Sequence, residues 1–568
     1  MPFPADARLY VFDAMVVGGE RLLDLPLARR LLRIPDAVRM LHECGLEAEP
    51  KVWVHLGGRD ELEAQIRGVL EAEQPFETDG LILAADGAAY MDTKSYKWKP
   101  AAQQTVDFLA RRAPRAARLR PPHADAPGHE LHYLFVGVAA GLVRALGLPQ
   151  PPGVTELFPR RAAQKLGTGQ AAHGGYGPTP FIVPDAPLAY LYQHPAGAPA
   201  IDGQVVEMRR GPAPATKKTA AYIGDGAAEP WVLERIRHDR ARELASGSYF
   251  GNDYRTAFST WQNIVVPFPP EQLWTPTTSY FRTTKDRAFV VQTKYTRDVK
   301  RRLAGPLAGA EWVVDLMAGR GGDLFSWLDL GFANLIAVDT DADALMELQR
   351  RRMEFARQAA GGRRIGRRGP TSLFTLEADL SQPAPVTAEA IFRRGLPPAG
   401  ADGVLVNLGV HYLMGTEAGA ANFAALCRGI TRVGGTVTLT FMRGQAVVDR
   451  LKDVPTGETW DVREEGVLKY SVRRQYAKTR LEPAGQRIGV LLPFSNGEYY
   501  EEFLVNEKTL AAAMKRMRFE RVQDGSFLDY RTDFGRANEL TEGDLAFLGL
   551  YGFAVFRRRA DPRSRKKA

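Results

Sequence analysis

The feature that most constrains the fold of this chain is a glycine-rich turn that follows an apolar run. Residues Trp312 to Leu324 read Trp-Val-Val-Asp-Leu-Met-Ala-Gly-Arg-Gly-Gly-Asp-Leu, and a second apolar run ends at Asp339. Such a run predicts a buried strand and then a tight turn, because glycine lets the backbone approach a ligand closely. In doubly wound α/β sheets ligands bind beyond the carboxyl ends of the strands, so Asp339 can hold ribose hydroxyls.

The spacing of the glycines argues against a dinucleotide. Nicotinamide-binding proteins use Gly-x-Gly-x-x-Gly, which places pyrophosphate at a helix N-terminus. The run Gly319-Arg-Gly-Gly-Asp323 instead puts a carboxylate where pyrophosphate would need donors. A ligand without phosphates fits, and S-adenosylmethionine (SAM) is one: Asp315 and Asp323 can face its ammonium group while Asp339 takes the ribose. The alternative is an ordinary α/β turn that binds nothing.

Length and composition are those of a multidomain globular protein. The 568 residues, 45% of them apolar and 25% charged, correspond to about three domains of roughly 150 residues each. No apolar run reaches the roughly 18 residues that span a bilayer, and no secretory signal is evident, so we expect no membrane association. Two cysteines, Cys44 and Cys427, exclude a disulfide framework and a Cys-built zinc site, which favours the reducing cytoplasm.

The net charge permits a nucleic-acid partner without requiring one. A charge of +9 and a pI near 9.3 suit a polyanion, because each neutralised phosphate releases counterions. Part of the charge lies in the segments Arg557 to Ala568 and Arg363 to Arg368, and either segment can equally be a solvated run that binds nothing.

A pair of lysines alternates with aromatic residues in Tyr96-Lys-Trp-Lys-Pro100. On an extended strand Lys97 and Lys99 point to one face while Tyr96 and Trp98 point to the other. Two cations on one face can clamp a phosphate. An edge strand that uses lysines to prevent pairing with other chains is an equally good interpretation.

Four motifs follow one another in the order found in covalent nucleotidyltransferases. They are Val-Phe-Asp13, Asp79-Gly-Leu-Ile82, the lysine pair and Trp231-Val-Leu-Glu-Arg-Ile-Arg-His-Asp-Arg240. This set resembles the guanylyltransferase of mRNA capping enzymes. The resemblance implies that GTP, with magnesium, is bound by Asp79, Lys97, Lys99, Arg235 and Arg237, the two arginines lying on an oligonucleotide-binding (OB) barrel that closes over the nucleotide. Arg240 stands where the family has lysine.

The nucleophile of that family is missing from the sequence. The family attacks GTP with the lysine of Lys-x-Asp-Gly and forms a covalent lysine-GMP intermediate, yet this motif occurs nowhere in the 568 residues. Either another chain carries the lysine or this half has become a scaffold. We therefore expect the chain by itself to form no covalent GMP adduct.

The last third repeats one pattern, in which an apolar strand ends in a polar residue. Beyond the helix predicted for Ala342 to Ala360, one strand ends at Asp379 and another, Gly403 to Val410, leads into His411-Tyr412. Polar residues at the carboxyl ends of parallel strands build a pocket, in which Asp379 can reach adenine.

These motifs, with Leu492-Pro-Phe-Ser and the run Glu498 to Val505, resemble the cap guanine-N7 methyltransferases. Together with the upstream motifs they are similar to the fused capping enzymes of large DNA viruses. The resemblance implies SAM contacts from Lys300, Asp315, Gly319, Asp323, Asp339, Asp379 and Asn407. It implies cap contacts from Arg320, His411, Tyr412, Glu502 and Tyr530, with Phe527 an alternative to Tyr530. Met317 replaces a glycine that is usual in the family, and Arg320 a lysine.

The chemistry of the predicted reaction requires no acid or base and no metal. Guanine N7 carries a lone pair, so a protein need only desolvate it and align it with the methyl group, which can supply roughly 7 to 11 kcal/mol. Glu502 can accept the guanine N1 and N2 hydrogens, and His411 can donate to O6. The alternative for His411 is a core histidine whose nitrogens are paired.

The sequence thus predicts a truncated α+β nucleotidyltransferase domain (1–115), an OB-like β-barrel (116–270) and an α/β Rossmann-like SAM-dependent methyltransferase domain (271–568). We expect an mRNA capping protein that methylates guanine N7 and binds capped or triphosphate-ended RNA. Its expected protein partners are a small activating subunit or a chain that carries the missing lysine. We expect the protein in the cytoplasm, which for a viral protein means the host cytoplasm or the virion. The alternatives are a methyltransferase for another nucleic-acid position and a non-catalytic cap-binding scaffold.

Overall fold

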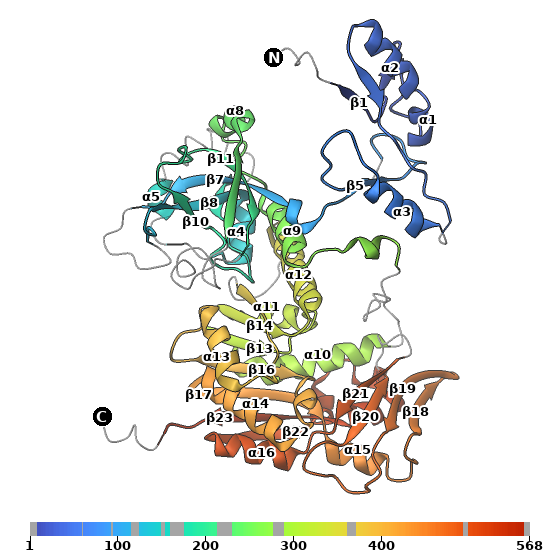
Figure 1. Cartoon of the computed structure of the whole chain (residues 1–568). Helices are drawn as coiled ribbons and strands as arrows, with labels where there is room; N and C mark the ends of the chain where they lie inside the picture. Colours follow the sequence, from blue (N-terminus) through green and yellow to red (C-terminus); the bar gives the residue numbers. More distant parts are fainter. Residues whose placement is uncertain are drawn as a thin grey trace. The chain divides into compact units, whose positions relative to one another are not determined.

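The computed structural model describes residues 8–58, 61–92, 95–114, 124–148, 151, 154–158, 175–212, 230–275, 289–360, 371–491 and 498–561. The chain divides into two compact units, Met1–Gln104 with Asn263–Thr278, and Thr105–Gln262 with Ser279–Ala568 (Figure 1). The basic segment Arg363 to Arg368 and the Leu492-Pro-Phe-Ser motif lie outside the described residues.

The first unit is made of short elements with little core. Its helices and strands are β1 (Leu9–Val11), β2 (Val16–Val17), β3 (Glu20–Arg21), α1 (Leu27–Leu31), α2 (Ile34–Glu43), β4 (Ala48–Pro50), α3 (Leu62–Glu71), β5 (Leu81–Ala84), β6 (Ser95–Trp98), η1 (Ala101–Gln103) and η4 (Pro270–Leu273). The strands pair only two by two, as β1–β4, β2–β3 and β5–β6. A two-stranded sheet is marginally stable alone, so packing around these sheets must hold the unit together.

Two contacts tie the motifs of the first unit into this packing. The acid of the Val-Phe-Asp motif, Asp13, is bound by both Nε (2.9 Å) and Nη2 (3.0 Å) of the buried Arg30. The indole of Trp98 donates to the carbonyl of Phe268 (2.7 Å), so the described part of segment 263–278 belongs to this unit.

An antiparallel sheet begins the second unit. Its strands are β7 (Thr105–Arg112), β8 (His129–Ala139), β9 (Tyr176–Pro180), β10 (Leu191–Pro195), β11 (Val205–Arg210) and β12 (Trp231–Ile236), in the order β10-β8-β7-β11-β12 with β9 paired to β8. The accompanying helices are α4 (Ala140–Leu146), α5 (Val154–Leu157), η3 (His238–Arg240), α8 (Ala241–Ala245) and α9 (Tyr254–Val265). The boundary expected at residue 115 lies beyond β7, whereas the units divide at Gln104, because β7 hydrogen-bonds to β8 and β11. The OB assignment stays a prediction.

A seven-stranded sheet forms the centre of the last third. Its strands are β13 (Trp312–Leu316), β14 (Asn334–Asp339), β15 (Ser372–Glu377), β16 (Ala401–Asn407), β17 (Thr431–Met442), β22 (Phe519–Ser526) and β23 (Tyr551–Arg558). Their order is β15-β14-β13-β16-β17-β23-β22, and β23 runs antiparallel to both of its neighbours, β17 and β22. The first five strands have the 3-2-1-4-5 arrangement of doubly wound sheets. The predicted Rossmann-like α/β fold is therefore confirmed.

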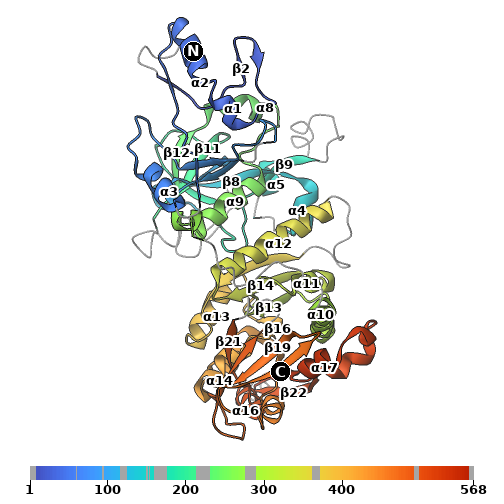
Figure 2. The same cartoon turned by 90° about the vertical axis from the view of Figure 1, so that its right-hand side faces the viewer.

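Helices cover both faces of this sheet (Figures 1 and 2). Successive residues of β13 pack on opposite faces: Val313 packs with α11 (Leu324–Leu330) and α12 (Ala342–Ala360), and Val314 with α13 (Ala384–Arg393), α14 (Glu417–Ile430) and α16 (Glu507–Arg516). Strands buried on both faces read as continuous apolar runs, which explains the Val-rich sequence of β13 and β16.

A second antiparallel sheet is inserted between β17 and β22. It consists of β18 (Thr459–Glu464), β19 (Val467–Arg474), β20 (Arg487–Leu491) and β21 (Tyr499–Phe503), paired in chain order. Its buried side packs against α10 (Val290–Ala304), α15 (Gly444–Arg450), η8 (Phe527–Asp533) and α17 (Glu542–Leu548) in one apolar cluster. This insertion places Glu502 of β21 beside the main sheet.

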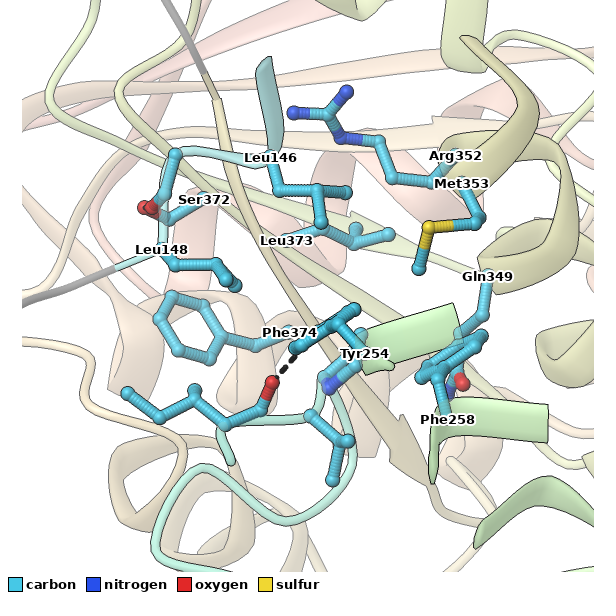
Figure 3. A pocket seen from close by; sticks show the side chains of 14 residues that line it. Leu146, Leu148, Tyr254, Phe258, Gln349, Arg352, Met353, Ser372, Leu373 and Phe374 are labelled. Atoms are coloured by element: carbon cyan, nitrogen blue, oxygen red, sulfur yellow. Dashed lines mark hydrogen bonds between the residues drawn. The ribbon is translucent and has the colours of Figure 1, made fainter. Parts of the chain in front are cut away.

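Helix α12 connects the two sheets of the second unit (Figure 2). Its Arg352, 5% exposed, donates from Nη2 to the carbonyls of Ala145 (2.5 Å) and Thr371 (2.9 Å). A mostly apolar cavity lies beside it, and there the Tyr254 hydroxyl donates to the carbonyl of Ile182 at 2.6 Å (Figure 3). The bond from Arg352 to Ala145 of α4 joins the antiparallel sheet to the Rossmann-like part of the same unit.

Gly80 of the Asp-Gly motif supplies a first prediction. Its φ is +135°, and a Cβ at this position would lie 1.9 Å from the carbonyl oxygen of Trp98. Gly80→Ala should therefore separate β5 from β6 and cost at least about 3 kcal/mol of stability. Hydrogen exchange of residues 81–98 measures this separation. Gly87→Ala, where a Cβ meets no atom within 4 Å, is the control. Equal protection in both variants would contradict the prediction.

Candidate functional site

The glycine-rich turn between β13 and α11 borders open space. Met317 (φ 61°), Gly319 (φ 51°) and Gly321 (φ 70°) have left-handed backbone conformations. A Cβ at Gly321 would lie 2.8 Å from the Leu348 side chain, so packing requires glycine there. A Cβ at Gly319 or Gly322 would meet no atom within 4 Å, and this space beside the turn can admit a ligand.

The carboxylate of Asp339 closes the turn at the end of β14. Its Oδ2 accepts the backbone N–H of Gly319 (2.7 Å), and its Oδ1 accepts that of Asp341 (3.0 Å). The parallel register sets Leu316 of β13 beside Val338 of β14, so the two strands end at the same edge. The structure thus brings Gly319 and Asp339 together at the edge where the sequence predicts the pocket.

Three further charged residues gather behind the turn. Lys300 of α10 donates to Asp323 (3.1 Å), with the two side chains 12% and 15% exposed. Asp315, 6% exposed, accepts the indole N–H of Trp327 at 2.7 Å. Burial, together with the negative charge of Asp323, raises the pKa of Asp315 to about 7. Asp315 is therefore a poorly solvated acid that a nearby cation would help to ionise.

Asp379 lies two residues beyond the end of β15 and is exposed. Both the hydroxyl (2.7 Å) and the backbone N–H (2.8 Å) of Ser381 donate to it, and these bonds lower the pKa of Asp379. Its carboxylate is held in one orientation at the same edge as Asp339, because Asp339 pairs with Glu377 across β14 and β15.

The end of β16 turns sharply from Asn407 to His411. Thr440 of β17 donates to Oδ1 of Asn407 (3.0 Å), and Asn407 Nδ2 is buried without a partner in the described part of the chain. Leu408 then adopts φ 55°, and a Cβ at Gly409 would lie 2.5 Å from the sulfur of Met317. The turn leads directly into η7 (Val410–Leu413).

His411 of η7 and Glu502 of β21 form a buried polar pair. They are 4% and 8% exposed, and His411 Nδ1 lies 3.6 Å from Glu502 Oε2. Burial lowers the pKa of His411 to about 3 and raises the pKa of Glu502 to about 8. His411 is therefore neutral, so the pair is not an ion pair. Nε2 of His411 is buried without a partner among the described residues.

The remaining predicted cap residues differ in their surroundings. The ring of Tyr412, 54% exposed, lies 4.1 Å from that of His411, centre to centre. The Tyr530 hydroxyl accepts from Gln523 (3.2 Å), while its ring packs 5.6 Å from that of Phe553. Phe527 is fully buried in the apolar cluster that contains α10. Arg320, within the glycine-rich turn, is half-buried.

The sequence reasoning missed Tyr551, at the start of β23. This residue is 8% exposed, and the charge of nearby Glu502 adds to the burial that holds its pKa well above the ordinary value. Its ring lies 5.8 Å from that of Phe527. A tyrosine at the start of an apolar strand is predicted from sequence to be a core residue. Only the position of the inserted sheet brings it near Glu502.

Most residues of the guanylyltransferase-like motifs form ion pairs with one another or with other acids. In the first unit Lys99 makes an ion pair with Asp79, whose pKa it lowers, and the charge of Lys97 lowers that pKa further. In the second unit, Arg235 donates to Glu207 (2.6 Å). Arg237 donates to Asp107 (2.7 Å) and to Asp239 (2.8 Å).

Among the described residues, no group of three or more His, Cys, Asp and Glu side chains is arranged to hold a metal ion. No helix in the same residues is both long and apolar enough to cross a membrane.

Several proteins with similar sequences are viral mRNA-capping enzymes. The chain is 34% identical over 569 residues to an mRNA-capping enzyme of African swine fever virus, covering 98% of this chain and 62% of that protein. It is 21% identical over 497 residues to a probable mRNA-capping enzyme of Acanthamoeba polyphaga mimivirus, covering 78% of this chain and 40% of the relative. The chain thus spans less than two thirds of the relatives' length. The predicted resemblance to viral capping enzymes is confirmed.

Other comparisons add less. No protein-family model matches the chain. A SAM-dependent methyltransferase of Clostridium acetobutylicum is 13% identical and covers 48% of this chain and 94% of its own, with a TM-score of 0.30. The CcbJ methyltransferase of Streptomyces caelestis is 14% identical and covers 49% of this chain and 100% of its own, with a TM-score of 0.32. The fold assignment rests on the strand order described above.

The buried Glu502 makes stability depend on pH. Because its pKa rises from 4.5 to about 8 on folding, the folded state holds the proton longer, and stability falls as pH rises through this window. Glu502→Gln removes that loss, so the variant should gain on the order of 4 kcal/mol over the wild type at pH 8 and little at pH 5. Thermal unfolding at both pH values measures the gain.

The neighbouring residue Glu501 is the control for this measurement. Its side chain is 61% exposed, so Glu501→Gln should change stability equally little at pH 5 and pH 8. A gain for Glu502→Gln that is the same at both pH values would contradict a buried, proton-holding carboxyl.

Proposed function

Because the chain is similar to viral mRNA-capping enzymes along nearly its whole length, we propose that it is a capping protein whose second unit transfers the methyl group of SAM to N7 of the cap guanine. The observation that carries this proposal is the single turn from Asn407 to His411. At one end lies the amide nitrogen of Asn407 and at the other Nε2 of His411, both buried with no partner among the described residues, and Glu502 lies beside His411.

The cofactor fits the acidic edge of the sheet. SAM supplies a methyl group on a sulfonium centre, with an ammonium, a carboxylate and a ribose elsewhere in the molecule. Asp339 would hold the ribose hydroxyls, and Asp379 the adenine. Asp323 with Lys300, beside the buried Asp315, would hold the charged methionine end. The open space beside Gly319 supports this fit, since a ligand can lie against the backbone there.

The substrate pocket fits a purine with donors on one edge. The pKa of Glu502 is about 8 in the free protein, and guanine would ionise it on binding, because the N1 and N2 hydrogens favour the carboxylate that accepts them. Nε2 of neutral His411, which has no partner among the described residues, can donate to O6. A base without those hydrogens would leave Glu502 buried and unpaired. The loss of binding free energy would give strong selectivity for guanine over such bases. Tyr412 and Tyr551 flank this pair, and Arg320 and Tyr530 are weaker candidates for the cap side.

Residues of the pocket can promote transfer without donating or removing a proton. The lone pair of N7 forms the new bond to the methyl carbon, and the electron pair of the broken carbon–sulfur bond stays on sulfur. Positive charge thereby moves onto the guanine. An ionised Glu502 next to that ring stabilises the charge as it develops, and the surrounding apolar residues exclude water that would screen it.

The first unit would belong to a guanylyltransferase that this chain does not complete. Lys97 and Lys99 would bind the phosphates of GTP, and the neighbouring Asp79 would help to hold magnesium. Arg235 and Arg237, in the second unit, would carry the other nucleotide-binding motif of that family. The missing Lys-x-Asp-Gly lysine would come from a polypeptide that packs on the first unit. Exposed large apolar side chains in this unit support such a partner: Phe12, Met15, Val16, Leu25, Leu32, Met40, Val52, Val54, Ile82, Tyr90, Met91 and Tyr96.

Capped or triphosphate-ended RNA is the proposed macromolecular substrate. The net charge of +9 supports it, because a basic protein binds the phosphate backbone with release of counterions. A small activating subunit is a further proposed partner.

Three substitutions separate cofactor binding from cap binding. His411→Ala and Glu502→Ala should lower N7 methylation of GpppA-RNA at least about a hundredfold while SAM still binds, because each leaves a guanine edge atom unpaired. Asp339→Ala should weaken SAM binding itself. Methyl transfer from labelled SAM and calorimetric titration with SAM measure the two effects.

Glu501→Ala is the matched control and should keep full activity, since Glu501 is exposed on the same strand. Full activity in all three site variants would overturn the proposed site. Transfer to RNA lacking a cap guanosine would favour a methyltransferase for another position, and no transfer at all would favour a cap-binding scaffold.

The incomplete guanylyltransferase motifs give a separate prediction. Incubated with labelled GTP and magnesium, the chain alone should form no acid-stable protein-GMP adduct, because none of its 568 residues provides the Lys-x-Asp-Gly nucleophile. Autoradiography of the denatured protein checks this, with a complete capping enzyme as the positive control. A labelled band from this chain would contradict the prediction.

A further inference from the structure

Thr440 of β17 is the residue that joins the cofactor side of the site to the cap side. It is fully buried, and the parallel register places it directly beside Asn407 of β16. Its hydroxyl donates to Asn407 Oδ1 (3.0 Å), and its carbonyl accepts the backbone N–H of Leu408 (2.9 Å). One threonine thus holds two consecutive residues at the point where β16 ends.

The side-chain bond decides which end of the Asn407 amide meets the ligand. An amide has one accepting oxygen and one donating nitrogen. Because Thr440 occupies the oxygen, the nitrogen is the end left over, and it is buried with no partner among the described residues. A buried donor without an acceptor is costly. The geometry therefore favours a ligand atom that accepts a hydrogen bond at this place.

The main-chain bond acts on the turn that follows. Leu408 adopts φ 55°, a conformation that side chains other than glycine seldom take without support. The hydrogen bond from its N–H to Thr440 supports it, and Gly409 then passes Met317 so closely that a Cβ would lie 2.5 Å from the sulfur. Two residues later the chain presents His411.

We propose that Thr440 is a positioning residue for methyl transfer: its hydroxyl fixes the Asn407 amide as a donor to SAM. This inference rests on the proposed function, because it assigns the buried Asn407 nitrogen to the cofactor. Thr440 itself need not touch SAM, and its hydroxyl takes no part in the chemical step.

Substitution of the hydroxyl alone tests the inference. Thr440→Val keeps the branched shape and the main-chain bond to Leu408, but it frees the Asn407 amide to rotate. We expect the KM and the Kd for SAM to rise about five- to tenfold, the effect of one lost hydrogen bond. We expect kcat and the KM for a GpppA cap analogue to stay within about twofold.

Two matched variants separate positioning from packing. Thr440→Ser keeps the hydroxyl and should restore the wild-type KM for SAM to within about twofold. Thr438→Val, at a buried threonine two residues earlier on the same strand, should leave it unchanged. If Thr440→Ser is as weak as Thr440→Val, or Thr438→Val is equally impaired, packing explains the loss and the inference is wrong.

A double-mutant cycle with Asn407 makes the test specific. In an Asn407→Ala background there is no amide to orient, so adding Thr440→Val should cause no further rise in the KM for SAM. If the two substitutions raise the KM for SAM additively, the inference is wrong. Thermal unfolding of each variant, measured in parallel, separates a loss of stability from a loss of SAM binding.

The outcomes distinguish this inference from the proposed function. If the wild-type chain neither binds SAM nor methylates the cap analogue, the proposed function fails, and the role of Thr440 fails with it. If the wild type does both while Thr440→Val keeps the wild-type KM for SAM, only the role of Thr440 is overturned.

Discussion

Parallel pairing between β14, β13, β16 and β17 is the constraint on which the rest of the site depends. The register sets Leu316 beside Val338 and Val406, and Asn407 beside Thr440. All four strands therefore end at one edge of the sheet, where the regular hydrogen-bond ladder between the strands stops. Asp339, Asp379 and Asn407, which are proposed to hold the cofactor, lie at or just beyond that edge, so a shift of one strand by a single residue would turn its terminal side chain to the opposite face.

The cap side of the site is held at a cost in stability. Glu502 is buried without a cationic partner among the described residues, and His411 is buried with one nitrogen unpaired. Such groups persist only where the surrounding structure determines their place. Here the inserted sheet, α10 and α17 share one apolar cluster that fixes β21 against the main sheet. A ligand that supplied the missing hydrogen bonds would recover part of that cost, which links binding to stability.

Periodicity was informative where segments are long and buried. The helix expected over Ala342 to Ala360 has those bounds, and the strand expected to end at Asp339 does end there. It failed where a local feature interrupts the pattern. Apolar residues recur at helical spacing from Leu25 to Leu46, which on its own predicts one helix, yet the segment is split into α1 and α2, because Pro35 starts a new helix. The strand expected to run to Val410 stops at Asn407, because Leu408 is left-handed.

The sequence by itself determined the doubly wound class, the glycine-rich turn and the acids that follow each strand, because a buried strand needs apolar residues and a strand end tolerates charge. Only the tertiary structure decided that Thr440 bonds to Asn407, that Tyr551 lies near Glu502, and that Asp315 is buried against Trp327. These contacts join residues from separate strands and helices. Their distances depend on register and on the position of the inserted sheet, which no local pattern encodes.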